Sequence, residues 1–348
     1  VLKKVGDAFW NAPPANRVRV HFDVGPNYSS VYGTDADAYI IQSGARGGQL
    51  FRETACVSSP TLYCQFPAYP GTVSWKIGFQ VYQGAPVRDD GEELTPSQQD
   101  LCMQGDPSVS CRRRFDRNRK DIFHYVLYAH ARGKPKSTFP CLDGGGHPVA
   151  ALGNGSCAVA ANPDFNIPST SSGAADLRGG DALVTLGFWG NAFIGSEFVQ
   201  ASTTMHELGH NLELTHGGPL QFPQEPNCKP NYVSVMSYLF QARGLIDGTG
   251  VAHLDFAREA HSGVDENLLS DGFPGPFTNG PVNYRASWYA PLASPLAQAL
   301  GLSAATKFCN GLSFPAGGPP SVPMVRLDAL TIDWNGDGPL GNPGATGQ

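Results

Sequence analysis

Three histidines and one glutamate near the middle of the chain constrain its fold more than any other feature. The segment His206-Glu207-Leu208-Gly209-His210 places two imidazoles four residues apart, and His216 follows six residues later. On a helix, residues i and i+4 lie on one face, one turn apart. Both imidazoles can therefore reach one metal ion. His216 can complete the set if the helix ends soon after His210 and the chain turns back.

Chance rarely produces this pattern. The chain holds nine histidines in 348 residues. Random placement of the same composition gives an H-E-x-x-H segment roughly 6 times in 1,000 such chains, and the third histidine lowers that by a further factor of about 40. Zn²⁺ suits the ligands, because a catalytic zinc site keeps three protein ligands and one water. Glu207 is then placed to accept a proton from that water. A helix whose histidines are merely solvated is the alternative.

The residues around the motif independently predict a helix. Ser196 is a favourable N-cap, and Glu197 suits the positive end of the helix dipole. Apolar residues then recur at steps of three and four, the period of one helix face. They are Phe198, Ala201, Met205, Leu208 and Leu212. This stripe is predicted to face the core, so that the two histidines and the glutamate face a cleft.

The residues from His206 onward resemble the metzincin clan of zinc metallopeptidases. In that clan H-E-x-x-H-x-x-G-x-x-H is followed by a methionine turn. Here the segment Ser234-Val235-Met236-Ser237-Tyr238 follows the third histidine, with a tyrosine two residues after the methionine, as in astacins and serralysins. The stretch from His206 to about Glu266 also resembles a group of secreted microbial metzincin-like proteases, which share the segment Leu254-Asp255-Phe256. The resemblance covers roughly the middle third of the chain strongly.

The resemblance implies a role for each motif residue. His206, His210 and His216 would bind Zn²⁺. Glu207 would act as the general base, and Tyr238 would donate a hydrogen bond to the oxyanion. In addition, Met236 would lie beneath the metal as a structural residue and not as a ligand.

The resemblance also implies an α+β fold with a twisted mixed sheet, an active-site helix, long irregular loops and a C-terminal extension. Residues 1–216 would form an upper subdomain with the sheet and the zinc helix, and residues 217–348 a lower, loop-rich subdomain with the Met-turn. Glycine and proline make up about a fifth of the chain, which agrees with long loops. We further expect Leu186 to Trp189 to line the cleft, where a peptide would add a strand.

One residue departs from the clan motif, because Glu213 stands where the clan has glycine. A helix commonly ends at a left-handed residue, where glycine is nearly free and other residues cost about 1 kcal/mol or more. Glu213 must either adopt that conformation or end the helix differently, and the placement of His216 depends on which occurs. The Glu213 side chain would either lie in solvent or point into the site and modulate the metal.

Periodicity predicts the remaining elements. Strands are expected at 17–24, 74–82, 123–130 and 181–189, and the end of a helix at 112–121. Segments rich in glycine, proline, serine and alanine are expected to form surface loops or a wrapping extension. These are 134–180 and 267–325.

Eight cysteines, none in a C-x-x-C pair, favour disulfides in an oxidising compartment over a zinc knuckle. Pairing cysteines that lie close together in the sequence gives three disulfides that close short loops, and the two remaining cysteines would form the fourth. The alternative is that several cysteines are free and buried. The predicted pairs are 56–64, 102–111, 141–157 and 228–309. The chain begins at Val1 and not at methionine, so we expect a processed form of a secreted protein whose targeting segment was removed.

Two acidic segments predict Ca²⁺ sites. The first resembles the front half of a calcium loop, although its twelfth position is Gly344 where a glutamate is wanted, so a polar turn is the alternative. The second could bind calcium in loop form. The two sets are Asp333, Asn335 and Asp337, and Asp265, Glu266 and Asp271.

Charge and hydropathy narrow the expected partners. The net charge of −6 argues against a nucleic acid, and no apolar run reaches the 18 or more residues of a membrane span. We expect a monomer that acts on a protein or peptide substrate. The sequence thus favours a secreted zinc endopeptidase. A binding or adhesion module that keeps the fold but has weak or no turnover is the main alternative, and a zinc hydrolase with another substrate is a third.

Overall fold

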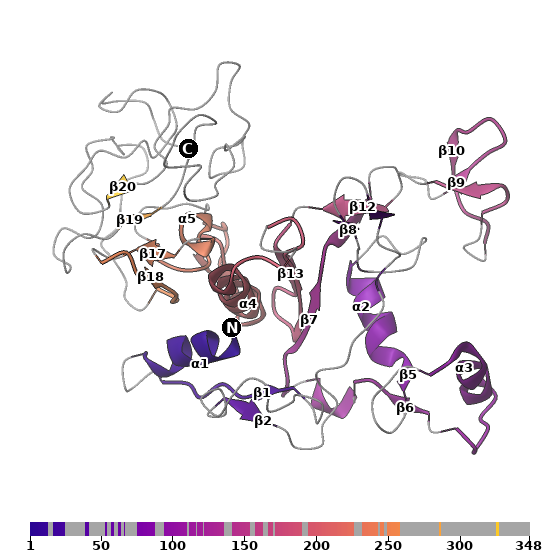
Figure 1. The fold of residues 1–348 in the computed structure, drawn as a ribbon, viewed down its shortest axis with the longest axis horizontal. Helices are drawn as coiled ribbons and strands as arrows, with labels where there is room; N and C mark the ends of the chain where they lie inside the picture. The colour runs from indigo at the N-terminus through magenta and orange to yellow at the C-terminus, as the bar shows by residue number, and fades with distance from the viewer. Residues whose placement is uncertain are drawn as a thin grey trace. The chain divides into compact units, whose positions relative to one another are not determined.

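The computed structural model shows a mixed α+β chain of short strands and five α-helices in its described part (Figure 1). The described residues are 1–12, 17–24, 39–41, 53, 57–58, 62–63, 66, 75–87, 94–109, 111–115, 117–120, 122–135, 141–153, 157–162, 166–169, 171–189, 194–225, 232–242, 244–246, 249–257, 285–286 and 325–326.

The chain divides into two compact units. One contains residues 3–18 with 201–348, and the other residues 19–200. The expected subdomains, 1–216 and 217–348, stay a prediction.

The unit of residues 19–200 carries most of the strands. Its elements are β1 (Phe22–Asp23), β2 (Ile40–Ile41), β3 (Val57–Ser58), β4 (Leu62–Tyr63), α2 (Trp75–Gly84), β5 (Pro86–Val87), α3 (Pro96–Met103), β6 (Arg112–Arg113), the 3₁₀ turn η4 (Arg117–Arg119), β7 (Tyr125–Ala129), β8 (Arg132–Pro135), β9 (Cys141–Leu142), β10 (Pro148–Val149), β11 (Ala160–Ala161), β12 (Asn166–Ser169), β13 (Gly173–Ala175) and β14 (Asp181–Thr185). These strands all pair in two- or three-stranded sheets.

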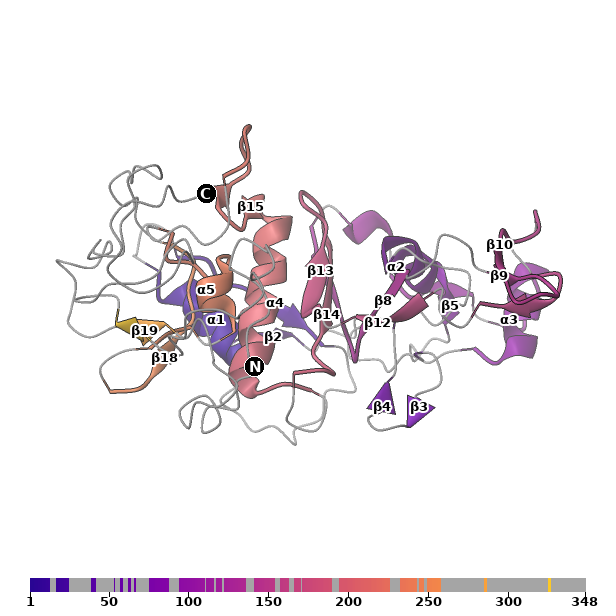
Figure 2. The same ribbon diagram turned by 90° about the horizontal axis from the view of Figure 1, so that it is seen from above.

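The other unit carries the histidine motif. Its elements are α1 (Leu2–Trp10), residues 201–211 of the helix α4 (Glu197–Asn211), β15 (Leu214–Thr215), β16 (Gly218–Pro219), α5 (Tyr238–Gln241), β17 (Leu245–Ile246), β18 (Ala252–His253), β19 (Arg285–Ala286) and β20 (Val325–Arg326), several of which are labelled in Figure 2. The last four strands form one sheet in the order β18-β17-β19-β20.

A small mixed sheet of order β13-β14-β7 has β14 at its centre. β14 runs parallel to β7 and antiparallel to β13. Residues 182–185 of β14 are all buried, as expected of a strand covered on both faces. The strands predicted at 123–130 and 181–189 are therefore confirmed in their cores.

The expected peptide-binding position of Leu186 to Trp189 is wrong. These residues follow the end of β14 and lie in a turn, closed by a hydrogen bond of 3.0 Å from the Trp189 amide to the Leu186 carbonyl. β14 is also paired along both of its edges, so it cannot accept a further strand. An open edge of this sheet belongs to β13.

The strand predicted at 74–82 is also wrong, because this segment forms the helix α2. Trp75, Phe79 and Tyr82 recur at helical spacing as well as near strand spacing, so the short pattern fits both periods. Tertiary packing decides for the helix. Phe79 is fully buried among Phe66, Leu127 and Leu183, and Trp75 and Tyr82 pack against this cluster.

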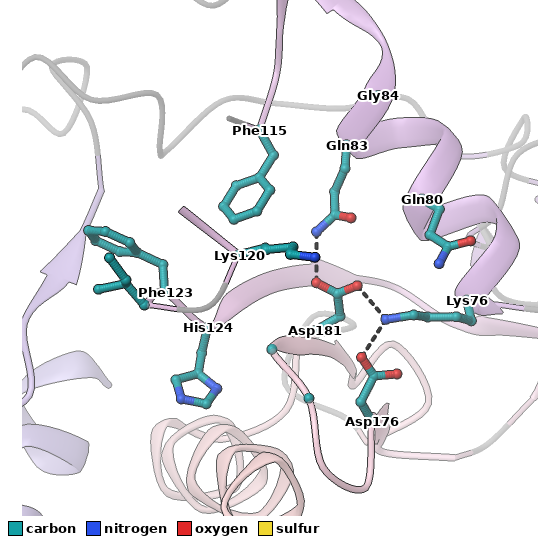
Figure 3. A pocket seen from close by; sticks show the side chains of 13 residues that line it. Lys76, Gln80, Gln83, Gly84, Phe115, Lys120, Phe123, His124, Asp176 and Asp181 are labelled. Carbon is teal, nitrogen blue, oxygen red and sulfur yellow. Dashed lines mark hydrogen bonds and ion pairs between the residues drawn. The ribbon is translucent and has the colours of Figure 1, made fainter. Parts of the chain in front are cut away.

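Charged groups tie α2 to the turn between β13 and β14 (Figure 3). The Lys76 ammonium bridges the carboxylates of Asp176 and Asp181, and the Gln83 amide donates to Asp181 at 2.7 Å. Burial lowers the pKa of Lys76, but the two carboxylates outweigh it and leave this pKa raised. These residues line an open pocket of about 780 Å³. The negative charges of its two carboxylates are thus compensated by groups of the fold itself.

Three further predictions need correction. The helix end expected at 112–121 is instead strand β6 and the turn η4, and the helix α3 lies upstream, where Thr95 and Gln98 form a capping box. The strand expected at 17–24 is reduced to β1. The loop expected at 134–180 contains short strands, of which β12 pairs with β8 over four residues.

Two of the four predicted disulfides are confirmed. Cys102 bonds to Cys111 and Cys141 to Cys157, with Cα–Cα distances of 5.5 and 5.3 Å. The other four cysteines lie outside the described residues. They are Cys56, Cys64, Cys228 and Cys309.

Among the helices of the described part, none combines the length and apolar character needed to cross a bilayer.

Candidate metal centre

The helix α4 begins as its sequence predicts. The Ser196 hydroxyl accepts a hydrogen bond from the Val199 amide at 3.2 Å, and the Ser196 carbonyl accepts one from the Gln200 amide. The pattern of buried residues differs from the single apolar stripe that the sequence predicts. All residues from 201 to 209 are buried, including three with hydroxyl groups, whereas Leu212 is exposed. A helix enclosed on all sides in this way holds its histidines in fixed positions.

The structure brings the three histidines together. One ring nitrogen from each of His206, His210 and His216 lies within 4.8 Å of the others. His206 is 2% exposed, and the other two are partly buried. Within the described residues they make the single group of three or more histidine, cysteine or acidic side chains arranged to hold a metal.

Backbone carbonyls fix the orientation of two of the rings. His206 Nδ1 lies 2.9 Å from the Val235 carbonyl oxygen, and His210 Nδ1 lies 2.8 Å from that of Leu214. A carbonyl can only accept, so each Nδ1 carries the proton and each Nε2 of the neutral ring presents a lone pair. The two Nε2 atoms face each other at 3.1 Å. Two lone pairs at this distance repel unless a cation lies between them.

The donor set therefore fits zinc. Tetrahedral ligands at about 2.0–2.1 Å from zinc lie about 3.3–3.4 Å from each other, close to the observed separation of the two Nε2 atoms. Histidines that bind a metal generally donate their other ring N–H to such a partner, and this hydrogen bond fixes the tautomer and the ring orientation.

Burial prepares the three rings to act as neutral ligands. Burial lowers the pKa of His206 well below its ordinary value, and the neighbouring His210 charge lowers it further. Burial also lowers the pKa of His210. The pKa of His216 falls to about 4, again through burial first and His210 second. A metal at neutral pH would therefore compete with few protons for these nitrogens.

The stability of the metal-free protein is expected to fall as the pH drops from 7 to 5. The unfolded chain takes up protons on these histidines near pH 6.5, whereas folded His216 does so only near pH 4, so acid favours the unfolded state. His216 alone should account for about 1–2 kcal/mol of the loss. Urea unfolding in the presence of EDTA measures it. A His216→Asn variant should show a smaller pH dependence, and an equal dependence would contradict the assignment.

Glu213, two residues after the end of α4, adopts the left-handed conformation, with a φ of 70°. The Glu213 amide donates to the His210 carbonyl at 3.0 Å, and its carbonyl accepts from the Leu220 amide at 2.8 Å. The chain then reverses through the hairpin of β15 and β16, and His216 lies at its turn. The expected turn at this residue is therefore confirmed. Glu213 is exposed, which agrees with the reading as a turn residue in solvent.

Replacing Glu213 by glycine is expected to stabilise the protein by about 1 kcal/mol, because glycine adopts a positive φ without the steric cost. Differential scanning calorimetry of the metal-free protein should show a Tm rise of about 2 °C. Glu213→Ala serves as the control, since alanine also lacks the carboxylate but keeps the strain. An equal rise in both variants would mean that the charge, and not the conformation, is costly.

The segment around Met236 packs directly against α4. Met236 is fully buried, and a Cβ atom added at Gly209 would overlap its Sδ. The Phe256 ring also presses on this position, 2.9 Å from the added Cβ. Only glycine admits both side chains one residue before His210. The sequence contains this glycine, but the reason why a glycine is required there becomes evident only once Met236 and Phe256 are known to lie against it.

The two remaining motif residues differ in exposure. Glu207 is 3% exposed, in the second half of α4. Tyr238 is 51% exposed at the first position of α5, with its ring centroid 4.4 Å from that of His216. The phenol is thus open to solvent, whereas the carboxylate is held inside the fold.

The predicted calcium ligands cannot be placed, since all of them lie outside the described residues. They are Asp265, Glu266, Asp271, Asp333, Asn335 and Asp337.

The sequence did not predict that the Val235 and Leu214 carbonyls accept hydrogen bonds from the histidines. Every residue has a backbone carbonyl, so the residue type does not show which carbonyl acts as an acceptor.

Comparisons of the chain with protein-family models, with curated proteins and with solved structures gave no match.

Proposed function

We propose that this chain is a secreted zinc-dependent endopeptidase of the metzincin type. One observation carries the proposal: three neutral imidazoles converge, and two of them direct unprotonated Nε2 atoms at each other. Such a group demands a cation, and the sequence places Glu207 beside it. The buried Met236 against the helix and Tyr238 beside His216 support the metzincin assignment.

His206, His210 and His216 would hold the zinc ion. Zinc bound by three histidines supplies Lewis acidity, which lowers the pKa of a coordinated water towards neutrality and polarises a carbonyl. The Val235 and Leu214 carbonyls hold two of the imidazoles in the ligating tautomer. Burial of the ligands keeps them neutral, so that they need not lose protons when the metal enters.

The other motif residues would handle the proton and the developing charge. Glu207 accepts the proton of the attacking water and passes it to the departing amine nitrogen. Tyr238 donates a hydrogen bond to the carbonyl oxygen of the substrate as that oxygen gains negative charge. The exposure of the tyrosine and the 4.4 Å between its ring centroid and that of His216 support this role.

Proteins or peptides are the proposed substrates, and the chain is proposed to act as a monomer outside the cell. Two disulfides support an oxidising compartment. We assign no nucleic-acid partner, because the net charge is −6.

Metal analysis together with hydrolysis of casein or gelatin tests the proposal. We expect one zinc per chain, hydrolysis that a chelator abolishes, and recovery when zinc is restored. Mass spectrometry of the products should show cleavage at internal peptide bonds. One bound zinc without hydrolysis under any condition would instead support the binding or adhesion module, and a protein without zinc would overturn both readings.

A further inference from the structure

We propose that the N-terminal helix α1 positions the metal ligands of α4 through one aromatic contact, between Phe9 and Phe256. This inference rests on the proposed function, because it assigns two positioning residues to that same metal site. Neither residue touches a histidine of the triad in the described contacts. Their influence would pass through the methionine turn and through the backbone that orients His206.

The contact joins segments far apart in the sequence. The ring centroids of Phe9 and Phe256 lie 5.5 Å apart at an interplanar angle of 71°, an edge-to-face arrangement. Phe9 belongs to α1, whose residues Val5 and Ala8 are buried. Both views draw α1 close to α4 and α5, within the same compact unit (Figure 1 and Figure 2). The helix thus supports Phe256 from one side.

Phe256 also packs against α4. Its Cε1 would lie 2.9 Å from a Cβ at Gly209, and the Met236 side chain reaches the same point. Gly209 lies three residues after His206 and directly before His210. A shift of the Phe256 ring is therefore expected to change the packing beneath both helical ligands, because protein interiors are close-packed.

A backbone relay gives a second path to the same ligand. The Phe256 amide donates to its neighbour's carboxylate, Asp255 Oδ1, at 2.8 Å. The Asp255 carbonyl accepts from the Val235 amide at 2.8 Å, and the Val235 carbonyl is the acceptor that fixes His206 Nδ1 at 2.9 Å. The position of the segment 255–256 consequently sets the ring orientation of His206.

Phe9→Ala removes the support and is expected to weaken zinc binding about 10-fold, within the range for residues that act behind metal ligands. Competition with a chromophoric chelator measures the zinc affinity, and the visible spectrum of the Co²⁺-substituted protein reports ligand geometry. Phe9→Leu, which keeps apolar bulk, should recover most of the affinity. Trp10→Ala is the control, since it removes a larger aromatic ring from the same helix and its ring stacks with Arg17.

We expect Phe9→Ala to change both the zinc affinity and the Co²⁺ spectrum, while Trp10→Ala leaves both as in the wild type. Equal affinity and spectra in the wild type and Phe9→Ala would overturn the positioning role and leave the zinc peptidase intact. If Phe9→Ala does not fold, Phe256→Leu decides by the same two measurements, with an unchanged affinity again overturning the role. A wild-type chain that binds no zinc would overturn the proposed function itself, and this inference with it.

Discussion

Glu207→Gln is expected to reduce peptide-bond hydrolysis about 1,000-fold or more while leaving one zinc per chain. The amide has the size of the carboxylate but cannot accept the proton of the attacking water, and a positioned general base contributes about 10²- to 10⁴-fold to such a reaction. Glu207 is not among the three residues grouped as ligands, so the zinc content should not change. The rate constant kcat on a quenched fluorescent peptide and zinc analysis of the same sample give the two results.

Glu197→Gln is the matched control for this variant. Glu197 lies on the same helix in its first turn and is exposed, so the same chemical change there leaves the metal group untouched. Near wild-type hydrolysis in Glu207→Gln would remove the general-base role from this residue. Loss of zinc together with activity would show instead that Glu207 supports the ligands and not the proton transfer.

The second large effect is expected from His206→Ala, which should lower zinc affinity about 100- to 1,000-fold and bring hydrolysis below detection. The free energy of zinc binding to a structural site with four ligands is about 10–16 kcal/mol, so each ligand contributes several kcal/mol of binding free energy. His206 is the most buried of the three histidines, and the Val235 carbonyl would lose its partner as well. Zinc content after dialysis, the zinc dissociation constant and kcat measure the loss.

His253→Ala controls for the removal of a histidine as such, because His253 is exposed in β18 of the same unit. This variant should keep its zinc and its activity. Retention of one tightly bound zinc in His206→Ala would mean that the metal lies elsewhere, and the convergence of the three imidazoles would then be fortuitous. Circular dichroism spectra of both variants establish that the fold is retained.

Local patterns predicted the parts of the fold whose signals lie within one element. Ser196 caps α4 as a hydroxyl residue should, and the apolar runs at 125–129 and 181–185 are strands. The pattern at 74–82 failed because a short apolar alternation fits two periods, and the burial of Phe79 decided for the helix. Helix α3 was missed although Thr95, Pro96 and Gln98 carry the signal of a helix start.

The sequence by itself identified the histidines that the structure brings together, since two histidines one helical turn apart must share a face, and it marked Glu213 as the residue that must either adopt a left-handed conformation or end the helix differently. Only the tertiary structure decided which backbone carbonyls orient the imidazoles, how closely Met236 and Phe256 approach Gly209, and that α1 lies behind them. The reason is the range of the interactions. Helix periodicity and backbone sterics act over a few residues, whereas the packing around His206 joins residues 9, 206, 235 and 256, whose proximity no local pattern encodes.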